Sequence, residues 1–124
     1  MHYRETVVWT RAMRVAREVY GLARLLPREE MYGMRAQMTR AEVSVPSNIA
    51  EGWTRESKAE KRQFLAVAQG SLAELETQLT LCEEIGWFSI AQTKPLREDI
   101  DEPSRILTTL RRRLRLQAQP RDKA

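Results

Sequence analysis

The chain has 124 residues and a net charge of +4, with 42% hydrophobic and 31% charged residues. This composition is typical of one globular domain and excludes a disordered protein. It also excludes a transmembrane helix, because no window approaches 18 consecutive apolar residues. The N-terminal stretch lacks the apolar run of a secretory signal, and a single cysteine, Cys82, excludes an intramolecular disulfide or a CxxC metal site. We therefore expect a cytoplasmic protein.

The charge is distributed unevenly along the chain. Residues 1–40 contain eight Arg and four Glu, residues 41–104 contain six Lys or Arg against twelve Asp or Glu, and residues 105–124 contain seven against one. The ends are therefore basic and the middle is acidic. This charge distribution would favour binding of an anionic partner to the basic ends. It would equally favour self-association, in which the basic ends of one copy contact the acidic middle of another. Arginine outnumbers lysine seventeen to four. This excess favours phosphate recognition, but the base composition of the genome can also produce it.

The first predicted element is a helix over residues 8–26, ended by Pro27. An apolar residue recurs every three or four positions, and these residues are Val8, Ala12, Val15, Val19, Leu22 and Leu26. A second apolar stripe lies beside the first and contains Trp9, Met13, Ala16, Tyr20 and Ala23. The second stripe is either part of a broad core-facing surface or a subunit interface formed by Trp9, Met13, Ala16 and Tyr20.

The second predicted helix contains a proline. Its apolar stripe comprises Met31, Met34, Met38, Ala41, Val45 and Ile49, and Gly52 is the expected C-terminal stop. Because the stripe keeps its phase across Pro46, we favour one long helix that is kinked at this proline. The alternative is a fresh short helix with Ser44 as its cap.

The third predicted helix starts at Ser57, which pairs with Glu60 in a capping box, and closes at Gly86. Its apolar stripe contains Leu65, Ala68, Leu72, Leu75, Leu79 and Cys82. The fourth helix continues the pattern with Leu96, Ile100, Leu107, Leu110 and Leu114. Thr93 is its predicted cap, and Pro103 is expected to bend the helix or to delay its regular start.

Four helices with short connections predict an all-α, antiparallel up-down four-helix bundle whose second helix is kinked at a proline. The bundle is expected to form one domain over residues 1–117. A disordered basic tail is expected over residues 118–124.

Arginines form stripes on the first and the last predicted helix. The first helix carries Arg14, Arg17, Arg24 and Arg28 on one face, and the last carries Arg105, Arg112 and Arg115, with Arg111 beside them. In an antiparallel bundle the two stripes can merge into a phosphate-binding surface for RNA or DNA. The alternative is two solvated faces whose long arginines cover apolar surface.

Polar residues gather around the proline of the second helix, and they are Ser44, Ser47, Asn48 and Glu51, beside Pro46. We expect them to face Gly70, Ser71, Glu74 and Gln78 of the third helix. Gly70 would allow a neighbouring backbone to approach closely. The favoured interpretation is a buried, mutually satisfied polar network that fixes helix register. The alternative is a ligand or nucleic-acid contact.

The sequence gives little support for catalysis. The one histidine, His2, lies near the terminus, so no Ser–His or Cys–His pair is indicated. The Glu-x-x-His motif of di-iron bundles and the glycine-rich loops of nucleotide-binding proteins are both missing. We therefore expect a protein that is not an enzyme and that has no cofactor, metal site, membrane contact or small-molecule substrate.

Two segments, PREEMYGMRAQMTRAEVSVPSNIAEGWTR and FLAVAQGSLAELETQL, resemble the bacterial four-helix-bundle family of 23S rRNA intervening-sequence proteins. The matching positions are Pro27, Glu30, Tyr32, Gly33, Gln37, Ser44, Pro46, Asn48, Ile49, Ala50, Glu51, Gly52, Gly70, Ser71, Leu72, Glu74, Leu75, Glu76 and Thr77. Met34 stands where the family has Leu and Val45 where it has Ile, and both are mild changes that a helical core tolerates. Pro103 departs from the usual pattern of the last helix.

The resemblance implies a four-helix bundle that assembles as a homopentamer. It also implies relatedness to the accessory proteins of diversity-generating retroelements, which are basic pentamers that contact nucleic acid and a reverse transcriptase. It carries over no catalytic residue. The expected function is that of a non-enzymatic, self-assembling bundle that binds nucleic acid or serves as an accessory oligomer. The alternative is a scaffold or adaptor for a protein partner, without nucleic-acid affinity.

Overall fold

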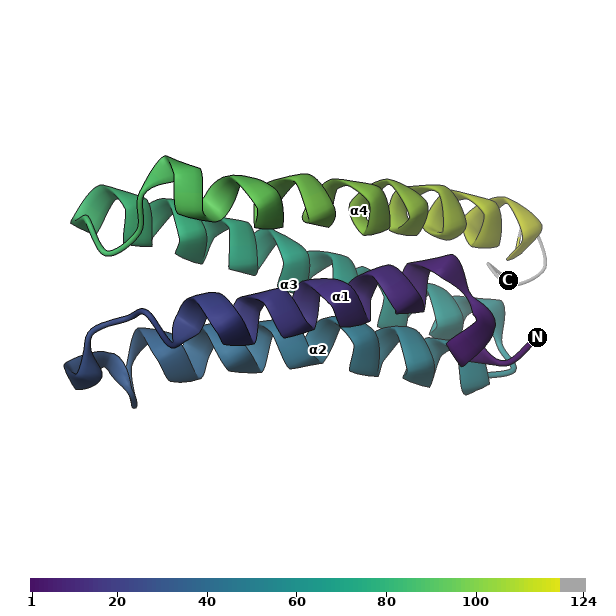
Figure 1. Ribbon diagram of the computed structural model, residues 1–124. Coiled ribbons are helices and arrows are strands. Elements are labelled where there is room, and N and C mark those ends of the chain that lie inside the picture. Colours follow the sequence, from purple (N-terminus) through teal and green to yellow (C-terminus); the bar gives the residue numbers. More distant parts are fainter. Residues whose placement is uncertain (119–124) are drawn as a thin grey trace.

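The computed structural model describes residues 1–118 and consists of four long helices that lie side by side (Figure 1). They are α1 (Val7–Ala23), α2 (Met34–Thr54), α3 (Lys58–Ile85) and α4 (Ile90–Ala118), with short 3-10 helices η1 (Tyr3–Glu5) and η2 (Arg28–Glu30). Successive helices run in opposite directions, and α1 and α3 each pack against both α2 and α4. The predicted all-α four-helix bundle is confirmed. Apart from Ala118, the tail predicted over 118–124 lies outside the described residues.

The core contains one apolar stripe from each helix. Its fully buried members include Val15 and Val19 of α1, Val45 and Ile49 of α2, Leu72, Leu75 and Leu79 of α3, and Ile100 and Leu107 of α4. These are the residues that the three- and four-residue spacing places on the inner face of each helix. The thiol of Cys82 is free and buried among them, and burial is the main reason that its pKa rises to about 11. None of the helices in residues 1–118 has an apolar stretch that would cross a bilayer.

Helix α3 has the predicted ends. Its N-terminal cap is Ser57, whose Oγ accepts a hydrogen bond from the Glu60 amide at 3.2 Å, and it ends at Gly86, which has a φ of 94°. Only glycine adopts such a left-handed conformation without a steric penalty.

Helix α4 begins earlier than predicted. Ser89, rather than Thr93, caps it: Ser89 Oγ accepts from the Gln92 amide at 3.1 Å, and Gln92 Oε1 accepts from the Ser89 amide at 2.8 Å. This reciprocal pair is a capping box. The prediction of Thr93 as the cap is therefore wrong, and Pro103 does not delay the start of the helix, because α4 continues through Pro95 and Pro103.

Helix α2 is continuous from Met34 to Thr54 and includes Pro46. The alternative of a fresh helix capped by Ser44 is therefore wrong. The side chain of Pro46 is buried, and its missing amide proton leaves the carbonyl of Glu42 without its usual donor. The kink expected at Pro46 stays a prediction. Met31, which the predicted stripe included, lies before the helix and is exposed.

Two glycines have roles that differ from those predicted. Gly52 does not end α2 but lies buried against α3, where an added Cβ would be 3.1 Å from Phe64 Cβ and 3.3 Å from the Lys61 carbonyl oxygen. Glycine at this position therefore lets α2 and α3 approach closely. Gly70 was expected to allow such an approach, but it is exposed and has open space around its Cα, so that expectation is wrong.

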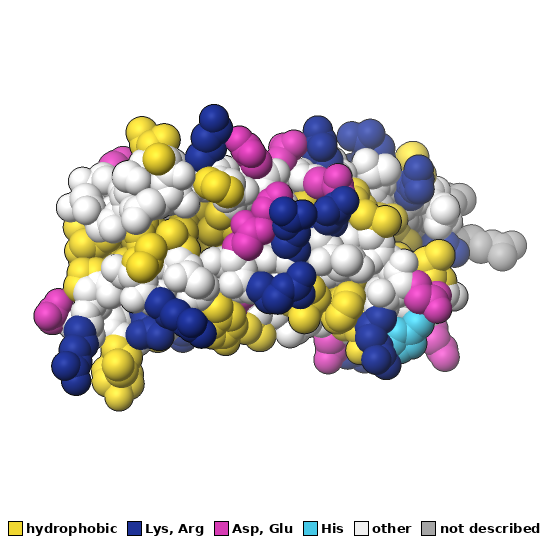
Figure 2. Space-filling view, viewed as in Figure 1, with side chains coloured by type: hydrophobic (Ala, Val, Ile, Leu, Met, Phe, Trp, Pro, Cys, Tyr) yellow, Lys and Arg dark blue, Asp and Glu magenta, His cyan; other side chains and the backbone are white. Residues whose placement is uncertain are grey.

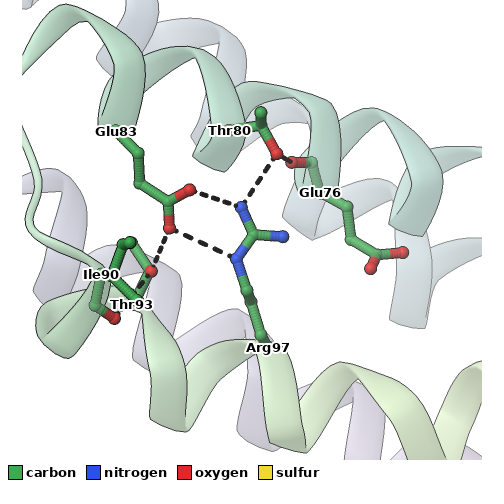
Figure 3. Close-up of polar contacts among 6 residues, drawn as sticks. All are labelled: Glu76, Thr80, Glu83, Ile90, Thr93 and Arg97. Atoms are coloured by element: carbon green, nitrogen blue, oxygen red, sulfur yellow. Dashed lines mark hydrogen bonds and ion pairs between the residues drawn. The ribbon is translucent and has the colours of Figure 1, made fainter.

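A polar cluster joins α3 to α4 near the connection between them (Figure 3). Arg97 donates from Nη2 to Glu83 Oε1 at 3.0 Å and to Thr80 Oγ1 at 2.9 Å, and from Nε to Glu83 Oε2 at 3.3 Å. Thr93, which is fully buried, donates its hydroxyl to the same carboxylate. The hydrogen bond from Thr93, followed by that from Arg97, lowers the pKa of Glu83 below its ordinary value.

Candidate functional site

The predicted polar network around Pro46 is smaller than expected. Ser71 Oγ donates to Ser44 Oγ at 2.8 Å, and this bond joins α3 to α2. Asn48 Nδ2 donates to Ser44 Oγ at 2.9 Å and to the Ser44 carbonyl at 2.7 Å. These hydrogen bonds link the three side chains at the boundary of the two helices, and we interpret them as a structural contact that fixes register.

The other members of the predicted polar set lie elsewhere. Ser47 is exposed and lines a groove between α1 and α2. Glu51 forms a surface ion pair at 2.8 Å with Arg55, the residue that follows α2. Glu74 is exposed and lines a shallow cavity beside Ser44 and Ser71. The structure therefore brings together only part of the set.

A buried carboxyl group in α2 was not predicted. Glu42 is 0% exposed, and neither carboxyl oxygen has a hydrogen-bond partner among the described residues. Burial raises its pKa to about 7. Glu42 lies four residues after Met38 and three before Val45, both fully buried, so the spacing alone places it on the core face. The apolar stripe predicted from sequence passed through its neighbour Ala41 instead.

The arginine stripe on α1 is partly neutralised within the bundle. Arg14 Nε lies 3.1 Å from Glu18 Oε1 and 3.4 Å from Asp99 Oδ2. The pKa of Glu18 is raised to about 7, first by burial and then by the hydrogen bond and charge of Asp99, against the opposing effect of Arg14. Arg11 also pairs with Glu102 of α4 at 2.7 Å. Arg14 therefore serves first as a link between α1 and α4.

The two predicted arginine stripes do not merge. The pairs Arg11–Glu102 and Arg14–Asp99 show that α1 and α4 run antiparallel, so the C-terminal end of α1 lies near the start of α4. Arg24 and Arg28 therefore lie at one end of the bundle, and the arginines of the last turns of α4 lie at the other. Figure 2 shows basic side chains along α1 with acidic ones beside them where α1 meets α4.

An arginine-rich cavity of about 290 Å³ lies between α3 and α4. Its lining residues are Arg62 and Gln69 of α3 and Thr108, Arg111, Arg112 and Arg115 of α4. Within residues 1–118, none of these four arginines forms an ion pair with a carboxylate. Three of the four were predicted candidates, whereas Arg105, predicted with them, pairs with Asp101 at 3.2 Å. In this cavity three of the α4 candidates lie together with Arg62 and have no carboxylate partner among residues 1–118.

Arg62 and Gln69, which form the α3 side of this cavity, were not predicted from the sequence, because they belong to no arginine stripe. A signal was nevertheless present. The antiparallel arrangement of consecutive helices places the start of α3 beside the end of α4, and Gln69 Nε2 donates to Thr108 Oγ1 at 2.6 Å. Counting residues backward along α3 and forward along α4 from the connection between them would have placed Arg62 beside the arginines of α4.

A mainly apolar groove of about 410 Å³ follows the boundary of α1 and α2. It contains all four residues predicted as a subunit interface, Trp9, Met13, Ala16 and Tyr20, together with Tyr3, Arg17, Val43, Pro46, Ser47 and Ala50. Tyr20 is 49% exposed and Val43 44% exposed. The second apolar stripe is therefore divided: Ala16 and Ala23 are buried, whereas Tyr20 remains half-exposed at the groove.

The described residues contain no cluster of three or more His, Cys, Asp or Glu that could hold a metal ion. His2 is exposed, and its Nδ1 accepts a hydrogen bond from the Arg4 amide at 3.2 Å in the cap of η1. Its ring therefore acts as a local cap.

Comparison with known proteins identifies the family of the chain. A search of curated proteins finds no match. A family model described as 23S rRNA-intervening sequence protein matches residues 4–109. The matched region includes the Ser44–Ser71 contact and the α1–α2 groove, and it ends before Arg111, Arg112 and Arg115. The chain therefore belongs to the 23S rRNA-intervening sequence protein family.

Proposed function

We propose that this protein is a non-enzymatic, self-assembling helical bundle that binds the phosphate backbone of nucleic acid. The observation that carries the proposal is the cavity in which Arg62, Arg111, Arg112 and Arg115 converge without a carboxylate partner among residues 1–118. Guanidinium groups match phosphate oxygens in geometry and charge. We expect the protein to act in the cytoplasm, because a single free, buried thiol suits a reducing compartment.

The kind of contact available favours binding with little sequence selectivity. The candidate arginines offer donors to phosphates, whereas reading bases requires a helix in a groove or exposed aromatic platforms. Each phosphate neutralised releases condensed counterions, so affinity should fall steeply as salt concentration rises. Binding should therefore be similar for unrelated sequences and strongest at low ionic strength.

The test is a salt titration of binding to RNA and DNA oligonucleotides by the wild type and two charge-reversal variants. Arg112→Glu with Arg115→Glu removes two cations of the α3–α4 cavity. Arg14→Glu with Arg17→Glu changes α1, where Arg14 already faces two carboxylates. The α4 variant should lose more affinity and show a shallower salt dependence. Absence of binding even at low salt would refute the nucleic-acid part of the proposal.

Self-assembly is proposed from the α1–α2 groove. Its apolar lining and its exposed Tyr20 and Val43 suit a protein contact, and a second copy would bury them. A ring-like homopentamer uses head-to-tail contacts, so each protomer must bury two different faces. Light scattering should give a mass above that of the protomer, Tyr20→Glu should lower it, and Tyr20→Phe should not. A wild type that is a stable monomer at micromolar concentration would contradict this.

The second candidate function is a scaffold for a protein partner, such as a reverse transcriptase, without nucleic-acid affinity. The same apolar groove favours it, because a groove of this kind accepts a helix or an extended segment of another protein. The salt titration separates the two. A protein that self-assembles but binds no oligonucleotide at low salt would be a scaffold.

A further inference from the structure

The arginines of the α3–α4 cavity are held in a defined arrangement. Arg111 Nη1 donates to Gln69 Oε1 at 2.8 Å, and Gln69 Nε2 donates to Thr108 Oγ1 at 2.6 Å. The Thr108 hydroxyl in turn donates to the Ser104 carbonyl at 3.1 Å. This chain of hydrogen bonds crosses from α4 to α3 and back, so it fixes the plane of the Arg111 guanidinium. Solvated surface arginines have no such support.

One edge of this guanidinium lacks an acceptor. Arg111 Nε is buried, and no described residue accepts a hydrogen bond from it. The Nε and Nη2 groups of an arginine form a fork that fits two oxygens of one anion. Arg97 shows this fork in use, because its Nε and Nη2 both donate to the carboxylate of Glu83 (Figure 3). Arg111 lines a cavity together with three further arginines and no carboxylate, so no residue of this cavity supplies the acceptor that its Nε lacks.

We propose that this cavity is a site for one phosphate monoester, at the end of a nucleic-acid strand or on a free nucleotide. A monoester carries a charge of about −1.5 to −2 at neutral pH and presents three terminal oxygens. An internal phosphodiester carries one charge and two free oxygens, so four guanidinium groups favour the monoester. Arg62, Arg111, Arg112 and Arg115 supply the compensating positive charge, and Gln69 acts as a positioning residue for Arg111.

A site for a phosphate monoester goes beyond the proposed binding of the nucleic-acid backbone. Binding of a phosphate at the end of a strand rests on the proposed function, whereas binding of a free nucleotide does not. The remaining arginines that face carboxylates, such as Arg14 and Arg105, provide no comparable fork. The family model matches the part of the chain that contains Arg62, Gln69 and Thr108 and ends before Arg111, Arg112 and Arg115.

The experiment measures binding of one single-stranded RNA oligonucleotide in three forms, with a 5′-phosphate, with a 3′-phosphate and with hydroxyl groups at both ends. At least one phosphorylated form should bind about tenfold more tightly than the hydroxyl form, as expected for one added charge-assisted bidentate contact. Arg111→Lys keeps the charge but loses the fork, so this preference should disappear. Arg113→Lys is the matched control, because Arg113 lines a separate cavity on the other side of α4, and it should keep the preference.

Circular dichroism and the thermal midpoint establish that Arg111→Lys is folded. If it is not, Arg62→Lys with Arg115→Lys tests the rim of the same cavity. Equal affinity for all three oligonucleotides, or a preference that survives these changes, would overturn the proposal. A nucleoside 5′-monophosphate and inorganic phosphate are titrated in parallel. If they bind in an Arg111-dependent way while no oligonucleotide binds, the site stands as a nucleotide site and the proposed function fails. If none of these probes binds, the site is refuted.

Discussion

The buried carboxyl of Glu42 should make the folded bundle less stable as pH rises. Its pKa is about 7 in the folded protein, against an ordinary value of 4.5. The folded state therefore retains a proton that the unfolded state has already lost. The contribution of Glu42 to stability is complete below pH 4.5 and is lost as pH rises to about 7. The difference in pKa corresponds to a loss of about 3 kcal/mol in the free energy of unfolding.

The perturbation is Glu42→Gln, which keeps the shape of the side chain but cannot ionise. Urea unfolding at pH 5 and pH 8, at one fixed protomer concentration, gives the two free energies. The wild type should lose about 2.5 kcal/mol between these conditions from this group, because the rest of the loss already occurs below pH 5, and Glu42→Gln should not lose that part. Glu42→Leu should go further and stabilise the bundle at pH 8, because it also removes two oxygens without partners among the described residues.

Glu18→Gln is the matched control. The pKa of Glu18 is also raised to about 7, so it lowers stability in the same direction. Its side chain is 29% exposed and lies beside Arg14, so solvent and the ion pair reduce its effect. The reasoning would be refuted if Glu42→Gln retained the full pH dependence of the wild type, or if Glu18→Gln alone abolished it.

Four further substitutions test the packing and the polar contacts. Gly52→Ala should destabilise the bundle by about 1 kcal/mol or more, because the new Cβ would lie 3.1 Å from Phe64 Cβ. Gly70→Ala should instead stabilise it by roughly 0.5–1 kcal/mol, since its Cβ meets nothing within 4 Å, and thermal unfolding distinguishes the two. Asn48→Leu should lower the free energy of unfolding in urea by about 1–3 kcal/mol, because the Ser44–Ser71 contact loses its amide donor. If the variant kept full stability but lost binding to a partner, the network would be functional and not structural. The lowered pKa of Glu83 means that its stabilisation is present above the pKa of an unfolded glutamate and is lost as pH falls, so Glu83→Gln should reduce the acid sensitivity of the wild type in a pH titration of unfolding.

The helices could be predicted from sequence because each has a long apolar stripe with one period. Local signals also worked where one side chain determines the geometry, as at Ser57 and Gly86. The local signals failed at the start of α4 because Ser89 and Thr93 are both acceptable N-terminal caps. Ser89 is the cap in the structure, whereas Thr93 is buried and donates to Glu83 of α3. A rule based on residue type cannot detect a contact between helices.

The candidate site was predictable to a lesser degree. Composition pointed to the arginines, but only the packing of α1 against α4 shows that Arg14 is occupied by carboxylates. The glycines show the same limit, because Gly52 and Gly70 look alike in sequence and differ only in what lies beside them. Glu42 was missed because a stripe defined by apolar residues passes over a glutamate at a core position.

The reaction of the buried Cys82 thiol with a disulfide reagent can be used to measure transient opening of the bundle. Cys82 is the only cysteine in the chain, and it lies in the last turns of α3, where its carbonyl also accepts the amides of Gly86 and Trp87. With a pKa of about 11 and no solvent exposure, the thiol cannot react with a disulfide reagent in the closed fold. The labelling rate therefore measures how often this end of the α3–α4 hairpin separates. Repeating the measurement with protomer concentration varied would reveal whether assembly slows that motion, without any engineered probe.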